Sequence, residues 1–407
     1  MAAAECCFGV KHVASSFVSA ASRPKSVGSR ASHTLVSIPV RNFSESLFSS
    51  AAALGLGSSS LAPLPPKDKK CLGNGLHKSG LRIAATLSPP KEASKVQPRQ
   101  WTWTHKGSPL KINAVEFVTP GSSTPTRTIL MLPTISDVST TEEWDDVAQG
   151  LLSTSGTPYK IVCVDWPGLG LSDRPAIEYT ADLYEKFLVD FVSAKDGPLG
   201  SLTGSLVIIG GGHAATIAAR AVSKGLLDAA ALALVAPTWA GPLPIVFGRD
   251  ETMENRYGLL RSTLNSPGVG WAMYKYVVSS AKNIRLQYLT HVYADADNVT
   301  PSVVEKRTAL TQREGARFAP SAFLTGLLDP TRSRQEFIEL FANLEGRVPT
   351  LVLSSQKGPK RSKAEMEALE GAKGVTKFVR VPGALLPQEE YPDAVTDELV
   401  SFLESLP

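Results

Sequence analysis

Short runs of branched apolar residues recur along the chain from about residue 100 onward, each bounded by Gly, Pro or polar residues. Nearly uninterrupted Val/Ile/Leu runs are typical of strands in a parallel sheet, because helices cover both faces of such a sheet. The pattern predicts strands at Ile112–Thr119, Thr128–Leu132, Ile161–Asp165, Leu206–Gly210, Ala230–Ala236, Thr350–Ser354 and Lys377–Val381.

Between these runs the apolar residues follow the helical period instead. Amphipathic or Ala-rich stretches predict helices at Glu142–Leu152, Thr180–Ser193, Ala214–Lys224 and Tyr391–Leu406. Gly225 follows the third stretch as a helix-ending residue, and Pro392 stands in the first turn of the fourth. Strands and helices therefore alternate, which predicts an α/β fold with a doubly wound, mostly parallel sheet.

The alternation is interrupted once, between the strand ending at Ala236 and the strand starting at Thr350. The intervening segment is mostly helical in pattern and is dotted with Trp, Tyr and Phe. We expect it to form a helical cap over about residues 240–345, above the crevice where open α/β sheets bind their ligands. Most of its aromatic side chains are expected to form the core of the cap itself.

Residues 1–90 differ from the rest in composition and show no apolar periodicity. They hold ten Lys/Arg against three Asp/Glu, and seventeen of the first 88 residues are serine. This composition is typical of an organelle transit peptide, and the absence of an Arg-rich amphipathic N-terminus favours chloroplast over mitochondrion. We therefore expect a chloroplast transit peptide and a disordered linker over residues 1–90, with a disordered regulatory tail as the alternative.

The remaining residues 91–407 carry 32 basic and 35 acidic side chains, whereas the whole chain has a net charge of +4. That balance provides no electrostatic basis for binding nucleic acid. Cys163 is the only cysteine of this part and lies in a predicted buried strand, so neither a disulfide framework nor a cysteine metal cluster is expected. No cofactor or metal motif is found, and prolines break the uncharged segment 229–248, which argues against a transmembrane span.

One loop carries a recognisable signature, the run Val164-Asp-Trp-Pro-Gly-Leu-Gly-Leu-Ser-Asp-Arg-Pro175. Gly168 and Gly170 allow a tight turn, and Ser172 and Asp173 are expected to hydrogen-bond backbone groups of the loop. The run resembles the loop after a central strand in the α/β-hydrolase superfamily. The resemblance implies an α/β-hydrolase domain over residues 91–407, in a plant or algal chloroplast member of a superfamily made up mostly of esterases, lipases, dehalogenases and epoxide hydrolases.

The same resemblance identifies where a catalytic triad would stand, and three of these positions lack the expected side chain. The nucleophile position falls on Gly212, within Ile208-Ile-Gly-Gly-Gly-His-Ala-Ala215. The acid position falls on Gly358, and the base position falls on Leu386 or its neighbour Leu385. No histidine follows His291, so no shift of the alignment supplies the base. Because triad members act as a unit, their joint loss predicts a degenerate hydrolase.

A crevice under a cap remains, and its backbone N–H groups at the start of a helix suit a carbonyl, a carboxylate or a small anion. Candidate pocket residues are Gly212, His213, Trp239 and His291, together with Ile135. Ile135 follows Pro133-Thr134, which stands at the oxyanion loop of the superfamily, and its backbone amide would donate to an oxyanion. His213 is interpreted first as a packing or helix-start residue, because a cation there would oppose the helix dipole. A ligand contact or an unusual general base is the alternative for His213, and His291 is interpreted as a cap residue.

Two functions remain open. The first is a catalytically degenerate chloroplast protein with the α/β-hydrolase fold, which binds a hydrophobic, lipid-like small molecule or a partner protein. The alternative is an active ester-type hydrolase with a non-standard catalytic constellation. In that case His213 or His291 would act as the base, and the amides of Ile135 and His213 would stabilise the oxyanion.

Overall fold

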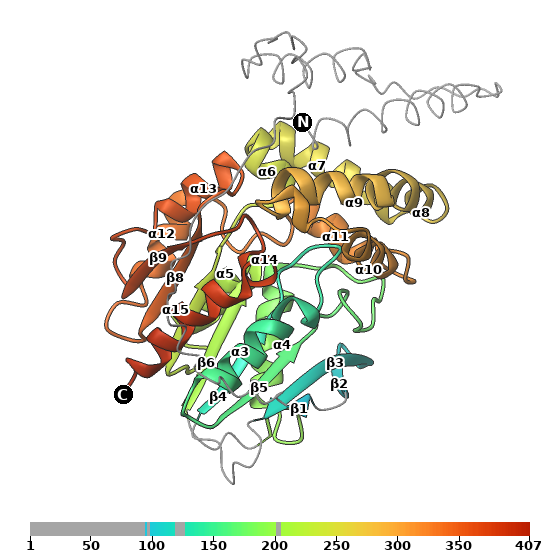
Figure 1. The fold of residues 1–407 in the computed structure, drawn as a ribbon. Coiled ribbons are helices and arrows are strands. Elements are labelled where there is room, and N and C mark those ends of the chain that lie inside the picture. Colours follow the sequence, from blue (N-terminus) through green and yellow to red (C-terminus); the bar gives the residue numbers. More distant parts are fainter. Residues whose placement is uncertain (1–93, 96–97, 119–126, 201–204) are drawn as a thin grey trace, which may run out of the picture. The chain divides into compact units, whose positions relative to one another are not determined.

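A computed structural model describes residues 94–95, 98–118, 127–200 and 205–407 of the chain. The leader predicted over residues 1–90 lies outside the described residues. All helices and strands below belong to one compact unit that includes Lys91–Pro407 (Figure 1).

The described strands form one sheet, in the order β1-β3-β5-β4-β6-β7-β8-β9, with β2 paired to β3 beside β1. The strands from β5 to β9 in this order are parallel, whereas β1, β2 and β5 each pair with β3 in antiparallel fashion. The bounds are β1 Ser94–Lys95, β2 Arg99–His105, β3 Ser108–Val118, β4 Arg127–Leu132, β5 Tyr159–Val164, β6 Ser205–Gly211, β7 Ala231–Val235, β8 Thr350–Ser355 and β9 Lys377–Val381.

All the predicted strands are present, but the hydrophobic runs did not reveal the hairpin of β2 and β3. Its tight turn is made by Lys106 and Gly107, which both have positive φ, at 48° and 82°. Positive φ at both central residues matches the twist of a two-residue hairpin. The sequence of β2, Arg-Gln-Trp-Thr-Trp-Thr-His, alternates between exposed and more buried positions, so it contains no continuous apolar run.

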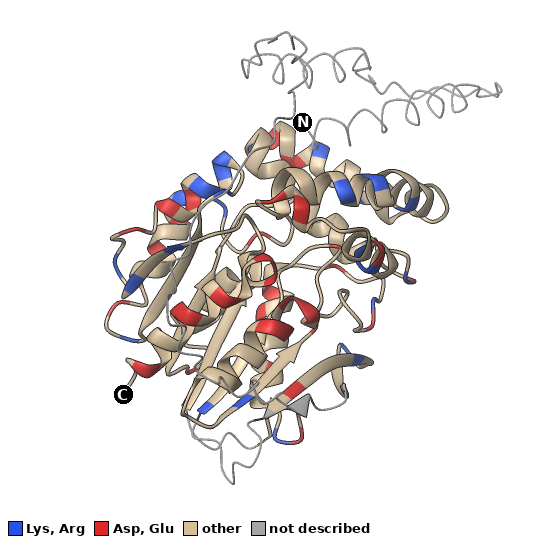
Figure 2. Ribbon diagram, in the orientation of Figure 1, with Lys and Arg blue, Asp and Glu red and all other residues tan. Residues whose placement is uncertain are grey.

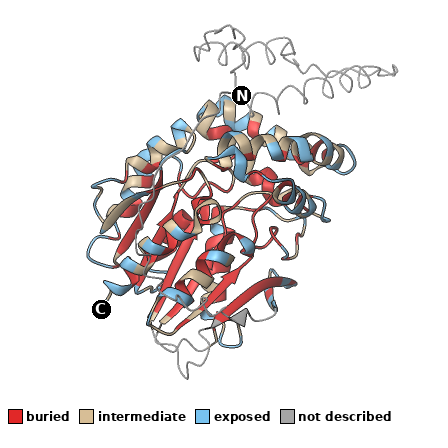
Figure 3. Cartoon of the chain, in the orientation of Figure 1, coloured by how far each residue is buried: buried red, intermediate tan, exposed pale blue. Residues whose placement is uncertain are grey.

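Alternate residues of the central strands point to opposite faces of the sheet and enter two separate apolar clusters. One cluster includes the helices α4 (Ala181–Ser193), α5 (Gly212–Ser223) and α12 (Arg334–Ala342). The other includes α3 (Asp145–Thr154) and α15 (Pro392–Glu404), which pack against each other. Buried residues accordingly follow the strands in Figure 3. Helices therefore cover both faces of the sheet, as expected for the predicted doubly wound α/β fold.

The signature loop after β5 is built partly as its sequence predicts, because Ser172 bonds a backbone group of the loop whereas Asp173 bonds the backbone of β3. The Ser172 hydroxyl donates to the Asp165 carbonyl at 2.9 Å, and the Asp173 carboxylate accepts from the Lys111 amide at 2.7 Å. Gly170 has a φ of 53°, and a Cβ there would overlap the Asp165 carboxylate. That carboxylate accepts three hydrogen bonds, yet burial still raises its pKa to about 6.

The segment between β7 and β8 is helical, as expected. Its elements before α12 are α6 Pro242–Phe247, α7 Glu251–Asn265, α8 Val269–Met273, η2 Tyr274–Val278, α9 Ala281–Gln287, η3 Tyr288–Val292, η4 Ala296–Asn298, α10 Pro301–Thr311 and α11 Phe318–Leu324. Tyr274, Tyr288 and Tyr293 are buried in two apolar clusters of this segment, whereas Phe318 and Phe323 pack against the cluster on the sheet, so the aromatic side chains form the core of the cap only in part. Trp271 and Tyr276 are exposed exceptions.

The remaining short elements are η1 (Thr141–Trp144), α13 (Lys360–Glu367) and α14 (Pro387–Glu390). The basic residues Lys360, Arg361 and Lys363 lie in α13. None of the helices in the described part of the chain has the length and apolar character needed to cross a bilayer. Charged side chains lie mainly on helices and loops around the apolar sheet (Figure 2).

Candidate functional site

The predicted nucleophile position lies at the sharp turn between β6 and α5, at the carboxyl end of the sheet (Figure 1). Gly212 is the first residue of α5 and has a φ of 54°, the left-handed conformation that raises a side chain above a strand-to-helix turn. A Cβ on Gly212 would lie 3.4 Å from Thr134 Cγ2 and 3.6 Å from Thr238 Oγ1. The turn therefore has the shape of a nucleophile elbow and room for a Cβ, but it carries no nucleophile.

The predicted base position is filled by apolar packing. Leu386 lies between β9 and α14 and is 5% exposed, and its backbone amide donates to the Val292 carbonyl at 3.3 Å. Its side chain joins a cluster with Val138, which follows β4, and with cap residues that include Tyr288. The cap thus packs directly on the position where the resemblance places a histidine.

The predicted acid position offers no carboxylate. Gly358 follows β8, and a Cβ at this position would lie 2.9 Å from Ser355 Oγ. An added side chain would therefore force its neighbour to move.

A buried carboxylic acid lies beside the elbow, where the sequence offered no signal for it. Glu143 Oε2 accepts from the Thr134 amide at 2.9 Å, and Glu143 Oε1 accepts from the Thr134 hydroxyl at 2.9 Å. Gln388 Nε2 lies 3.4 Å from Glu143 Oε2 and would lie 3.0 Å from a Cβ on Gly211. Burial, with a contribution from the nearby Glu389 charge, raises the pKa of Glu143 to about 7 despite these hydrogen bonds.

This arrangement changes the chemistry of the oxyanion loop. Pro133 and Thr134 stand where the family has His-Gly, and the Thr134 amide already donates to Glu143. An amide that is bound to a carboxylate is not free to stabilise a developing oxyanion.

His213, the residue after the elbow glycine, is 2% exposed and lies between two polar partners. Its Nδ1 is 2.7 Å from Thr238 Oγ1, and its Nε2 is 3.4 Å from Asp329 Oδ1. The edge of the imidazole also packs against Phe323, with ring centroids 4.9 Å apart. His213 therefore contacts a neighbouring loop, which was the first of the two interpretations offered by its sequence context.

Asp329 connects His213 to both ends of the cap. It accepts from the Gly241 amide at 2.9 Å and forms a salt bridge with Arg249, close to the start of the cap. Arg249 also donates to the Gly326 carbonyl at 2.8 Å, close to the end of the cap. The carboxylate, whose side chain is fully buried, thus joins α5 to the two segments that connect the cap to the sheet.

The other predicted pocket residues are not all gathered at the elbow. Ile135 is buried in the apolar cluster that covers one face of the sheet. Trp239 donates from its indole to Glu365 of α13 at 3.2 Å and packs near Phe337 of α12. His291 is half-buried in the turn η3 of the cap.

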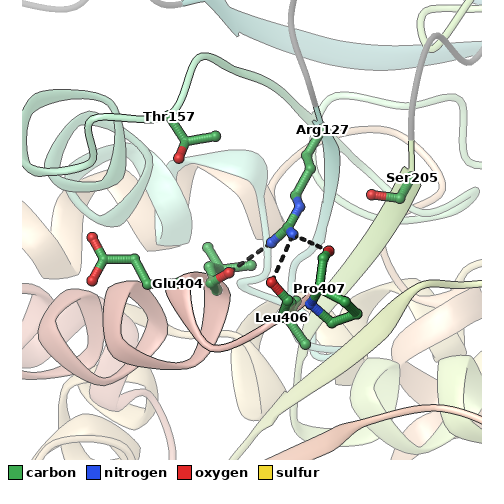
Figure 4. A pocket seen from close by; sticks show the side chains of 7 residues that line it. Arg127, Thr157, Ser205, Glu404, Leu406 and Pro407 are labelled. Atoms are coloured by element: carbon green, nitrogen blue, oxygen red, sulfur yellow. Dashed lines mark hydrogen bonds between the residues drawn. The ribbon is translucent and has the colours of Figure 1, made fainter.

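Two cavities lie in different parts of the domain. One, of about 390 Å³, separates the loop after β5 from the cap helices α7 and α11, and its lining includes Tyr179, Arg261, Asn265 and Phe318. The larger, of about 440 Å³, is at the opposite end of the sheet, where β4 and β6 begin. There Arg127 donates to the carbonyls of Leu403, Leu406 and Pro407 at 2.6, 3.1 and 2.6 Å, and so ties down the end of α15 (Figure 4).

The fold and the elbow define a class of protein. The sequence matches the profile of the alpha/beta hydrolase family over residues 129–398, and the chain belongs to that family. No curated protein sequence matches it significantly.

Several solved structures share this fold. A haloalkane dehalogenase of Agrobacterium tumefaciens is 16% identical, with a TM-score of 0.54 over 76% of this chain and 97% of that one. A thermophilic esterase from Thermogutta terrifontis is 18% identical, with a TM-score of 0.53 over 76% of this chain and 99% of the esterase. A probable hydrolytic enzyme from Pseudomonas aeruginosa is 17% identical, with a TM-score of 0.53 over 75% and 94%. At these identities the likeness concerns the fold alone.

Proposed function

We propose that this chain is a catalytically degenerate alpha/beta hydrolase that binds a hydrophobic small molecule between its sheet and its cap. The observation that carries the proposal is Gly212, which keeps the elbow conformation without a side chain that can attack a substrate. Leu386 supports it, because an apolar residue packed against the cap replaces the base. A hydrolase that loses a member of its triad typically loses about 10⁴-fold or more in rate.

The cleft of about 390 Å³ beside α7 and α11 supports the binding part of the proposal. Ile177 and Phe318 supply apolar surface there, whereas Arg261 and Asn265 supply polar groups. Such a mixture, at the junction of a cap and a core, is typical of small-molecule sites. The ligand class proposed is an apolar molecule with one polar or anionic end.

The test of degeneracy uses the full chain with a fluorophosphonate probe and a panel of short acyl esters. We expect no covalent labelling and no turnover above buffer, with an active serine hydrolase in the same reactions as the positive control. Labelling of a residue in the elbow region would refute the proposal.

The test of binding is mass spectrometry of small molecules that co-purify with the protein. Ala176 lies on the exposed rim of the cleft, so Ala176→Trp is expected to block the cleft and abolish co-purification. Ala230→Trp, at an exposed alanine before β7, is the matched control and should retain the ligand. Equal retention by both variants would place the ligand elsewhere.

One observation favours the alternative, an active hydrolase. Thr238, His213 and Asp329 form a hydroxyl–imidazole–carboxylate chain, with the hydroxyl near the vacant nucleophile position. Against a catalytic role, the Asp329 carboxylate already pairs with Arg249. Thr238→Val distinguishes the two functions, because valine has the shape of threonine without its hydroxyl. If the wild-type chain turns over a substrate and this variant does not, the chain is an active hydrolase.

We also propose import of the chain into chloroplasts, on the composition of residues 1–90. Import of a tagged full-length chain into isolated plastids, with removal of the leader, is the expected result. Full-length protein that remains outside the plastids would contradict it.

A further inference from the structure

The outer helices of the cap carry an excess of basic over acidic residues. Residues 255–294 contain five Lys/Arg and no Asp/Glu, although residues 91–407 as a whole are slightly acidic. This segment covers most of α7 and all of α8, η2, α9 and η3. Basic positions along these helices are visible in Figure 2. The surface they form therefore has a positive potential.

The basic residues at the outer end of this segment are not neutralised. The described Lys/Arg salt bridges of the cap join Arg249 to Glu254 and Asp329, Arg307 to Glu389, Arg332 to Glu254, and Arg334 to Glu365. None of them involves Lys275, Lys282 or Arg285. These three cations are available to an anionic surface.

Two aromatic rings are exposed on the same part of the cap. Trp271 is 46% exposed and Tyr276 is 66% exposed, and their ring centroids are 5.9 Å apart. The Lys275 ammonium lies 4.8 Å from the Trp271 ring and 5.7 Å from the Tyr276 ring. Val269 of α8 and Leu259 of the adjacent α7 are also exposed, so four of the six large exposed apolar side chains of the described residues lie between 259 and 276.

We propose that this cap tip, defined as Trp271, Lys275, Tyr276, Lys282 and Arg285, docks peripherally on a lipid bilayer that carries anionic headgroups. Trp and Tyr favour the headgroup level of a bilayer, because their rings are apolar and their N–H or O–H groups remain hydrated. Basic side chains beside them are attracted by the negative potential of anionic lipid. Stable peripheral attachment generally needs both contributions together.

A bilayer fits this surface better than a folded protein partner does. The cations are spread over η2 and α9, next along the chain to the exposed rings, which lie on α8 and η2. A fluid surface of mobile anionic headgroups matches such a spread, whereas a protein partner needs complementary charges at fixed positions. The inference does not depend on whether the crevice is catalytic, because none of its residues belongs to the elbow.

The first experiment measures co-sedimentation of the full 407-residue chain with vesicles. We expect binding to vesicles of phosphatidylcholine mixed with phosphatidylglycerol, weaker binding to phosphatidylcholine alone, and loss of binding at high salt. Trp271→Ala with Tyr276→Ala, and separately the reversal of Lys275, Lys282 and Arg285 to Glu, should each lower the partition coefficient at least about tenfold.

Matched controls separate the cap tip from general effects of charge and apolarity. Leu171 and Leu226 are each 50% exposed outside the cap, and their joint replacement by Ala should leave binding unchanged. Reversal of the exposed Lys195, Lys360 and Lys373 removes the same charge as the cap-tip reversal and should have a much smaller effect. The basic leader is present in every variant. Binding that survives both cap-tip changes would therefore assign it to the leader and overturn the proposal.

The second experiment reports on Trp271 directly. Brominated phospholipids quench tryptophan only at close range. Trp103, Trp144 and Trp166 are buried and Trp101 and Trp239 are partly buried, whereas Trp271 is exposed. We expect quenching of the wild-type chain, and loss of most of it in Trp271→Phe, which keeps an apolar ring and still binds. Binding without this difference, or capture of an acidic protein with no vesicle binding, would refute docking through the cap tip.

Discussion

Replacing Glu143 with Gln should stabilise the fold in a way that depends on pH. Glu143 is 2% exposed and pairs with the amide and hydroxyl of Thr134 beside the elbow. Glutamine has nearly the same shape, can accept from the Thr134 amide, and does not ionise. The variant therefore isolates the effect of the buried charge.

The magnitude follows from the pKa of Glu143, which rises from 4.5 to about 7 on folding. Since the folded state holds the proton more tightly, the contribution of Glu143 to stability is fully present below the unfolded pKa and is lost as pH rises through about 7. Ionisation should cost roughly 1 kcal/mol of folding free energy near pH 5 and about 3 kcal/mol near pH 8. The advantage of Glu143→Gln over wild type should grow by about 2 kcal/mol across that interval.

Urea unfolding of both proteins at several values of pH measures this difference. Glu142→Gln is the matched control, because the neighbouring Glu142 side chain is exposed. The control should differ from wild type by a small, nearly constant amount at every pH. A constant difference for Glu143→Gln as well would show that the Glu143 carboxyl is not desolvated as its burial indicates.

Substitutions at two further positions, Gly212 and Asp329, test the elbow and the attachment of the cap. Gly212→Ser should fold, because the space around a Cβ at this position is adequate. A side chain at positive φ should lower the free energy of unfolding by about 1–2 kcal/mol, which thermal unfolding measures. An unfolded variant would contradict the elbow geometry. Asp329→Ala should cost about 1–3 kcal/mol, because the buried Gly241 amide loses its acceptor and Arg249 keeps only Glu254 as its charged partner. Asp329→Asn, which loses the charge but retains an acceptor for the Gly241 amide, should cost less in chemical denaturation, and equal losses would show that the Gly241 hydrogen bond contributes nothing.

Much of the fold was predictable because the relevant signals are local. Strands buried on both faces must be apolar, so β4 through β8 appear as apolar runs in the sequence, whereas β9 at the sheet edge is only partly buried. The hairpin of β2 and β3 was missed because β2 lies partly exposed at the sheet edge and carries polar residues at alternate positions. The turn from Asp165 to Ser172 was predictable because its hydrogen bonds join residues close in sequence. The bond between Asp173 and Lys111 of β3 joins residues 62 positions apart and was not predictable in this way.

The site divides in the same way. The sequence by itself determined that Gly212, Gly358 and Leu386 carry no nucleophile, acid or base, because the absence of a side chain group is a property of the residue type. Only the tertiary structure decided that Glu143 is bound to the oxyanion loop and that His213 meets Asp329, residues separated by 116 positions. The contact of Glu143 depends on how the loop after β4 folds against η1. The contact of His213 depends on how the cap packs on the sheet, and that packing is a sum of many weak apolar interactions that no short segment of sequence records.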